Sequence, residues 1–92
     1  MTAERRWTLY LLETAGGALY TGITTDVARR LEQHRSGRGA KALRGKGPLV
    51  LRYQQPMESH GEALREEAAI KRLSPAQKRA WLARQRDTAD ES

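Results

Sequence analysis

Two residues of one predicted helix, Arg30 and His34, are four positions apart and therefore share a face of that helix. An arginine offers a fixed, permanently charged fork of donors that suits a phosphate group. A histidine can donate a hydrogen bond to a phosphate oxygen or move a proton near neutral pH. The pair could therefore act on a phosphate ester, although a solvated helix face is the ordinary explanation for an isolated pair of this spacing.

Two tyrosines, Tyr10 and Tyr20, lie in neighbouring runs of apolar and β-branched residues, WTLYLLE (7–13) and ALYTGI (18–23). Tyrosines in strands are usually half-buried packing residues whose hydroxyl stays in contact with water. The same hydroxyls could contact a phosphate if they lay beside the arginine. The sequence alone leaves both interpretations open.

Glu67 falls within the apolar arc of a later predicted helix, between Ala63, Leu64 and Ile70. A carboxylate at the edge of a core needs a partner, which could be a cation, a metal or several donors. Glu66 is similarly placed, between Ile70 and Leu73, so helical geometry does not choose between the two acids. His60 is expected to be an exposed residue near a helix start.

The segment SGRGAKALRGKGP (36–48) contains four of the eight glycines and one of the three prolines, which predicts an extended basic loop. Glycines let the backbone approach a ligand closely. The basic residues in and beside this segment are spaced for phosphate contacts and are predicted to bind nucleic acid: Arg35, Arg38, Lys41, Arg44 and Lys46. The alternative is a flexible basic loop that has no partner.

The composition limits the class of protein. The 92 residues predict one domain, 1–92, with a small aliphatic core, because 38% are hydrophobic and none is phenylalanine. There is no cysteine, which excludes disulfides and cysteine-based metal sites. The formal charge of +6 favours a polyanionic partner such as nucleic acid. No signal-peptide or membrane-spanning pattern is found, so we expect a soluble cytoplasmic protein. Such a protein could also associate with the nucleoid.

The predicted elements follow the order β-β-α-β-α-α. The strands are 7–13, 18–23 and 49–54, the first two joined at Gly16-Gly17. A helix capped by Thr25 or Asp26 runs to about residue 34. Capping boxes at 59–62 and 74–77, the second with proline at the first helical position, start helices that run to about residues 73 and 86. Residues 87–92 are predicted to form a flexible tail. This order predicts an α/β (α+β) fold, a small three-stranded, mainly antiparallel sheet flanked by helices.

Together, these residues and their order resemble the GIY-YIG nuclease family, and especially its small single-domain bacterial YhbQ-like subfamily. Thr8-Leu9-Tyr10 stands at the position of the first tripeptide, and Tyr20-Thr21-Gly22 at that of the second. Arg30 matches the catalytic arginine of the family and His34 a histidine common one turn later. Within ALREEAAIK (63–71), Glu67 matches the metal-binding glutamate. Thr8, Leu9 and Thr21 depart from the family pattern at backbone and packing positions. The resemblance covers about residues 7–83.

The resemblance implies a metal-dependent nuclease that hydrolyses DNA phosphodiester bonds, possible roles being DNA repair or processing. The implied catalytic residues are Tyr10, Tyr20, Arg30, His34 and Glu67. Glu67 would hold a divalent metal, Mg²⁺ or else Mn²⁺, and Tyr10 would act as general base once nearby cations lower its pKa. The alternatives are a non-catalytic nucleic-acid-binding module with the same fold and basic loop, and a structural protein that binds RNA or a ribonucleoprotein particle. The oligomeric state is left open.

The two-tyrosine site also makes a prediction about the hairpin. A plain two-residue Gly16-Gly17 loop would pair Tyr10 with Ile23 and place Tyr10 and Tyr20 on opposite faces of the sheet. A shared site therefore requires a loop of odd length, or a β-bulge, around these glycines. Glycine tolerates the positive φ that such turns need.

Overall fold

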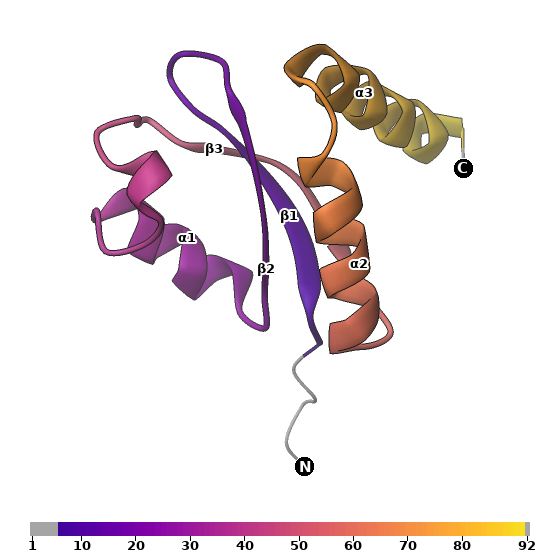
Figure 1. Cartoon of the computed structure of the whole chain (residues 1–92), viewed down its shortest axis with the longest axis horizontal. Coiled ribbons are helices and arrows are strands. Elements are labelled where there is room, and N and C mark those ends of the chain that lie inside the picture. Colours follow the sequence, from indigo (N-terminus) through magenta and orange to yellow (C-terminus); the bar gives the residue numbers. More distant parts are fainter. Residues whose placement is uncertain (1–5, 92) are drawn as a thin grey trace.

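The computed structural model describes residues 6–91, with side chains described for residues 6–85. Three strands, β1 (Thr8–Glu13), β2 (Leu19–Thr24) and β3 (Val50–Pro56), form one antiparallel sheet in the order β2-β1-β3. Helix α1 (Val27–Arg35) lies on one side of the sheet, and α2 (His60–Lys71) and α3 (Pro75–Glu91) lie on the other (Figure 1). The predicted α+β fold and its β-β-α-β-α-α order are confirmed.

The β1–β2 hairpin has the odd register that the two-tyrosine site requires. Tyr10 pairs with Gly22, and Leu12 with Tyr20, so both tyrosines point to the same face. The N–H of Thr14 donates to the carbonyl of Ala18 (2.9 Å), which leaves a three-residue turn, 15–17. The last residue of that turn is a glycine with φ +90°, the left-handed conformation typical of three-residue hairpins. The predicted shift from a plain two-residue loop is therefore confirmed.

Local signals define where the helices begin. Asp26, rather than Thr25, caps α1, because its carboxylate accepts from the N–H of Arg29 (3.0 Å). Ser74 and Gln77 exchange both bonds of a capping box at the start of α3. Helix α3 continues to residue 91, beyond its predicted end at about residue 86, and residue 92 lies outside the described part. The flexibility of residues 87–92 stays a prediction. No helix in the described part of the chain is long and apolar enough to span a membrane.

The alternation of side chains along β1 produces two cores. Leu9 and Leu11 face α2 and α3, where they pack with Ala63 and Ile70. The intervening residues of β1 face α1 and the basic segment, and their cluster consists of Tyr10, Leu12, Leu43 and Leu49. The buried residues of both clusters are mainly aliphatic, as the composition predicts. The second cluster places Tyr10 under the helix that carries the predicted catalytic residues.

The basic segment is folded rather than extended. It contains a short 3₁₀ helix, η1 (Lys41–Leu43), and the side chain of Leu43 is 3% exposed in the second core. The Ala15 N–H donates to the Lys46 carbonyl (2.9 Å), which attaches the segment to the β1–β2 turn. The prediction of an extended loop is therefore wrong, because one leucine of the segment is needed to close the α1 side of the sheet.

Candidate functional site

A buried hydrogen bond between Tyr10 and His34 is the centre of the candidate site. The Tyr10 hydroxyl and the His34 Nε2 are 2.8 Å apart, and both side chains are 2% exposed. The Tyr20 ring lies against both, with ring centres 6.4 Å from Tyr10 and 5.5 Å from His34. Three of the predicted site residues are thus brought together from β1, β2 and α1.

The second hydrogen bond of the imidazole fixes the direction of the first. The backbone N–H of Ala40 donates to His34 Nδ1 (3.2 Å), so this nitrogen carries no proton. In a neutral imidazole the proton is then on Nε2, and we infer that Nε2–H donates to the Tyr10 oxygen. Burial, reinforced by the charge of Arg30, lowers the pKa of His34, which keeps the ring neutral at physiological pH. His34 is therefore a donor to Tyr10.

Two glycines make room for this pair. A Cβ at Gly22 would lie 2.5 Å from the Tyr10 hydroxyl oxygen, and a Cβ at Gly39 would lie 2.1 Å from His34 Nδ1. Neither glycine has a positive φ. Gly22 therefore does not serve a turn between β2 and α1. Gly22 sits inside β2 opposite Tyr10, and its missing side chain leaves space for the phenol ring.

The pKa of Tyr10 moves in the opposite direction from the one expected. Burial, followed by the effect of Tyr20, raises the pKa of Tyr10 to about 12, and the Glu67 carboxylate adds to the rise. Hydrogen bonding and charge from Arg30 lower the pKa but do not outweigh burial. The prediction that neighbouring cations lower this pKa below its ordinary value is thus wrong for the protein alone. Tyr10 is a neutral phenol at pH 7.

Arg30 connects the buried pair to a polar hollow on the surface. Its guanidinium donates to the Gln33 side chain (3.0 Å) and also acts on Tyr10. A cavity of about 310 Å³ lies beside it, and its lining combines an aromatic ring, hydroxyls and two arginines: Trp7, Ile23, Thr24, Thr25, Asp26, Arg29, Arg30 and Gln33. The hollow is large enough for a phosphate group with part of its sugar. Arg30 is thus placed to contact a ligand there and Tyr10 at once.

Glu67 reaches the site electrostatically from the other layer. Its side chain is 19% exposed and pairs with Lys71, one turn later, at 3.3 Å. It makes no hydrogen bond to the Tyr10–His34 pair, yet its charge raises the pKa of Tyr10. Glu66 is exposed and instead raises the pKa of Tyr53 on β3, in addition to the effect of burial there. The structure therefore distinguishes the two acids that helical periodicity left open.

The donors around Glu67 limit the kind of metal that could bind. Among the described residues, no group of three or more histidine, cysteine or acidic side chains could hold an ion. A closed zinc-type site is therefore a poor fit for this part of the chain. A lone half-buried carboxylate fits Mg²⁺, which binds through one or two carboxylates and takes its other ligands from water and phosphate. Binding there would require the carboxylate to exchange Lys71 for the ion.

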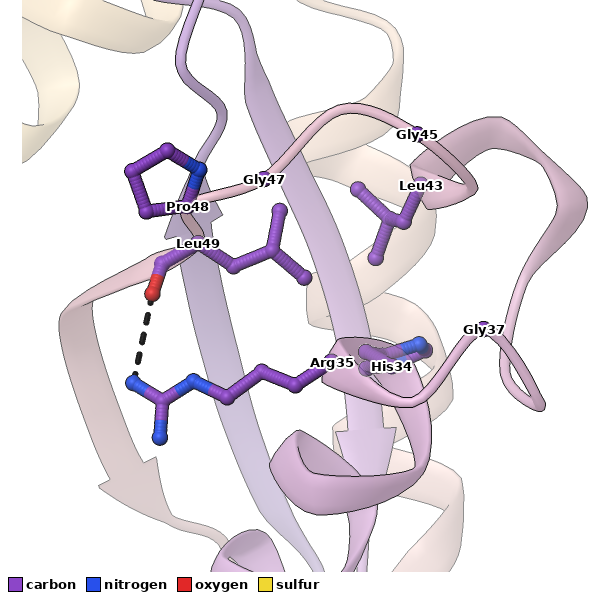
Figure 2. Close-up of a pocket in the computed structure, with 8 residues that line it drawn as sticks. All are labelled: His34, Arg35, Gly37, Leu43, Gly45, Gly47, Pro48 and Leu49. Carbon is purple, nitrogen blue, oxygen red and sulfur yellow. Dashed lines mark hydrogen bonds between the residues drawn. The ribbon is translucent and has the colours of Figure 1, made fainter.

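The predicted nucleic-acid-binding residues lie around the folded segment next to His34. Arg38, Lys41 and Lys46 are exposed. Arg35 donates to the Leu49 carbonyl (3.2 Å), and Arg44 donates to the Gly37 carbonyl (3.1 Å), so these two also hold the segment in shape. Figure 2 shows Arg35 extending from α1 to the Leu49 carbonyl. All five bases are on the α1 side of the sheet, together with Tyr10.

Some residues of the site carried no recognisable signal in the sequence. Gly39 and the Ala40 N–H position His34, but a glycine in a glycine-rich segment does not indicate such a role. Trp7 and Arg29 line the hollow beside Arg30. Their roles depend on how α1 packs against the end of β1. The sequence shows only that Arg29 is adjacent to Arg30, and two consecutive arginines are also found in ordinary basic helices.

Comparisons with known proteins agree with this geometry. Residues 6–80 match the model of the GIY-YIG catalytic domain. The chain is 58% identical over 79 residues to a UPF0213 protein of Sodalis glossinidius, covering 86% of this chain and 74% of that one. It is 54% identical over 77 residues to the UPF0213 protein YhbQ of Escherichia coli, covering 84% and 77%.

A solved structure shares the fold. The protein EF2693 of E. faecalis, determined by NMR in solution, is 35% identical and superposes with a TM-score of 0.63, covering 90% of this chain and 88% of that one. The GIY-YIG domain is that of a nuclease superfamily, which implies a nucleic-acid substrate. The names of the relatives specify no activity. The family match and the relatives show that this chain belongs to the GIY-YIG family, among the small bacterial proteins that include YhbQ.

Proposed function

We propose that this chain is a metal-dependent endonuclease that hydrolyses phosphodiester bonds in DNA, in repair or processing. The observation that carries the proposal is the contact between Tyr10 and the Nε2 of His34, at 2.8 Å, with Arg30 acting on the same hydroxyl. A buried tyrosine with one dedicated donor and one adjacent cation is more than strand packing requires. Such a group can accept a proton from water next to a phosphate.

The reaction would form a bond from a water oxygen to phosphorus and break one ester bond between phosphorus and oxygen. Arg30 would hold the phosphate and neutralise charge that develops on its oxygens. Tyr10, in its deprotonated form, would take the proton from the attacking water, and His34 Nε2–H would stabilise that phenolate. Tyr20 would orient the water or the phosphate. A Mg²⁺ ion held by Glu67 would supply further stabilisation of the charge on the phosphate and the leaving oxygen.

The experiment that tests this proposal is incubation of the pure protein with single-stranded, duplex, nicked and branched DNA and with RNA, in EDTA, Mg²⁺ or Mn²⁺. We expect cleavage only with a metal. Arg30→Ala and Glu67→Ala should each lower the rate about 100-fold or more, and Arg30→Ala should also weaken binding by about 1.5–3 kcal/mol.

Glu66→Ala is the matched control for Glu67→Ala, because it removes the neighbouring carboxylate that faces Tyr53 rather than Tyr10. It should cut at the wild-type rate. Cleavage by Glu67→Ala or Arg30→Ala at the wild-type rate would refute the assigned roles. Thermal unfolding of each variant checks that the fold is intact.

A second function is favoured by two observations. The pKa of Tyr10 is raised to about 12, and Glu67 is already paired with Lys71. Both fit a nucleic-acid-binding module that keeps the fold without catalysis. Tight binding to DNA with no cleavage of any substrate in any metal would support this alternative and contradict the endonuclease.

A further inference from the structure

A second cavity, of about 380 Å³, lies next to His34, does not have Tyr10 in its lining, and has no role in the reaction above. It is a half-open hollow between the end of α1 and the basic segment, and it is lined by His34, Arg35, Gly37, Leu43, Gly45, Gly47, Pro48 and Leu49. Figure 2 shows the Leu43 and Leu49 side chains pointing into the same space between these two elements. Its volume is near the lower limit of small-molecule sites, about 300–1,000 Å³.

The lining of the cavity suits a flat ring with apolar faces and polar edges. Leucine and proline side chains supply apolar walls. In the described part of the chain, the backbone N–H groups of Gly45 and Gly47 donate to no protein acceptor. They are therefore available to the edge of a bound ring. A bare phosphate fits these walls poorly, since leucine side chains cannot replace its hydration.

The surroundings of the cavity are strongly basic. Arg35 lines the cavity, and the segment beside it, residues 36–48, has no acidic residue and carries Arg38, Lys41, Arg44 and Lys46. An apolar hollow with cations around its entrance complements a nucleotide, whose base is apolar on both faces and whose phosphates are anionic. Single-stranded nucleic-acid sites combine these two features, a basic track for the backbone and a surface that takes the bases.

The cavity is also preformed. Arg44 bonds the Gly37 carbonyl, Arg35 bonds the Leu49 carbonyl, and the Ala15 N–H bonds the Lys46 carbonyl. These contacts join the two ends of the segment to each other, to α1 and to the hairpin. A site that is already shaped loses less free energy in ordering when a ligand binds.

We propose that this cavity binds one unpaired base of a nucleic-acid strand whose phosphates contact the surrounding cations. The proposal rests on the proposed function in taking nucleic acid as the substrate, and it specifies the substrate class. Because His34 contacts both this cavity and Tyr10, a base held here would belong to the same strand as a phosphate at Arg30. A base in a continuous duplex would first have to leave its stack. Single-stranded or branched nucleic acid is therefore the preferred substrate over intact duplex.

The test is equilibrium binding in EDTA, where no cleavage occurs. A fluorescent single-stranded oligonucleotide is compared with one of equal length in which tetrahydrofuran abasic residues replace the nucleosides, so that the phosphates are the same. We expect at least fivefold weaker binding of the abasic strand. Equal affinity for the two strands would overturn the proposal, because phosphate contacts alone would then account for binding.

A blocked cavity should remove the difference between the two strands. Gly47→Leu adds a side chain at a lining position where a Cβ meets only ordinary contacts, the nearest being the Leu49 nitrogen at 3.8 Å. We expect this variant to bind both strands with the affinity that the wild type shows for the abasic strand. Gly61→Leu, on α2 in the opposite layer, is the matched control and should discriminate like the wild type. Full discrimination by Gly47→Leu would place the base-binding site elsewhere.

A measurement without a variant covers the case in which Gly47→Leu does not fold. Titration of ¹⁵N-labelled wild type with dAMP should shift the amide signals of Gly45 and Gly47, and deoxyribose 5-phosphate should not. Equal shifts with both ligands would contradict the proposal. The two proposals also fail separately. Cleavage without discrimination between normal and abasic strands refutes only the base cavity, and discrimination without cleavage refutes only the nuclease.

Discussion

Gly22→Ala is the substitution that most directly tests the packing of the candidate site. The added Cβ would lie 2.5 Å from the Tyr10 hydroxyl oxygen and 2.6 Å from its Cζ. A Cβ atom essentially never approaches another heavy atom this closely, so the ring would have to move by about 0.9 Å to reach the 3.4 Å at which ordinary contact begins. Tyr10 is 2% exposed and has no open space to move into without disturbing His34.

The expected cost follows from two contributions. Overpacking of a core typically costs about 1–3 kcal/mol. Loss of the 2.8 Å bond between Tyr10 and His34 adds about 0.5–1.5 kcal/mol. We therefore expect the free energy of unfolding to fall by about 2–4 kcal/mol. Any nuclease activity should fall about 100-fold, since a displacement near 1 Å in a catalytic group has about this effect.

Urea denaturation followed by circular dichroism measures the first effect, and a double-mutant cycle locates its origin. In a Tyr10→Leu background the clashing atoms are absent, so Gly22→Ala should cost at least about 1 kcal/mol less than in the wild type. Gly16→Ala is the matched control. Its Cβ meets only the Thr14 hydroxyl at 4.0 Å, and its effect should stay within about 0.5 kcal/mol. An equal cost of Gly22→Ala in both backgrounds would refute the explanation.

Three further predictions concern other parts of the chain. Thr21→Val should stabilise the protein by about 1 kcal/mol in urea denaturation, because the buried Thr21 hydroxyl has no hydrogen-bond partner in the described structure; a destabilised variant would reveal an unrecognised partner. His34 has a folded pKa below its unfolded value, so its contribution to stability is present above pH 6.5 and is lost as the pH falls. Between pH 6.5 and 5.5 the wild type should lose up to about 1 kcal/mol more than His34→Gln, and parallel curves would exclude this assignment. Neutralising Lys41, Arg44 and Lys46 together should reduce the log–log salt dependence of duplex binding by roughly 0.9 for each lost phosphate contact, whereas an unchanged slope would remove the segment from the interface.

The fold could be predicted because its signals are local. The capping boxes at Ser59 and Ser74 begin α2 and α3 where expected, since each serine bonds an N–H three residues later. Boundaries were predicted less well where no such signal exists. Helix α3 continues past residue 86 because no proline or glycine ends it.

The geometry of the site depended on contacts between distant residues. Gly16 and Gly17 are compatible with a hairpin loop of two residues or of three. A loop of odd length was predicted only because a site shared by Tyr10 and Tyr20 requires it. The choice between Glu66 and Glu67 depended on which strand α2 packs against. The raised pKa of Tyr10 depends on burial by α1 and Leu43, which composition cannot report. The burial of Leu43 has no signal in the sequence, because apolar residues are sparse around it and form no strand or helix pattern.

A single guanidinium acts on both members of the Tyr10–His34 pair. The charge of Arg30 lowers the pKa of His34, which favours the neutral ring, and it lowers the pKa of Tyr10, which favours the phenolate. A neutral imidazole with its proton on Nε2 is the state that can donate to that phenolate. The two effects therefore favour the same arrangement, a His34 donor and a Tyr10 base. Burial, Tyr20 and Glu67 oppose it at Tyr10 and keep the phenol protonated in the protein alone. Neutralising the charge of Glu67 would remove one of these opposing contributions, which gives that carboxylate an influence on the pair although it makes no direct bond to it.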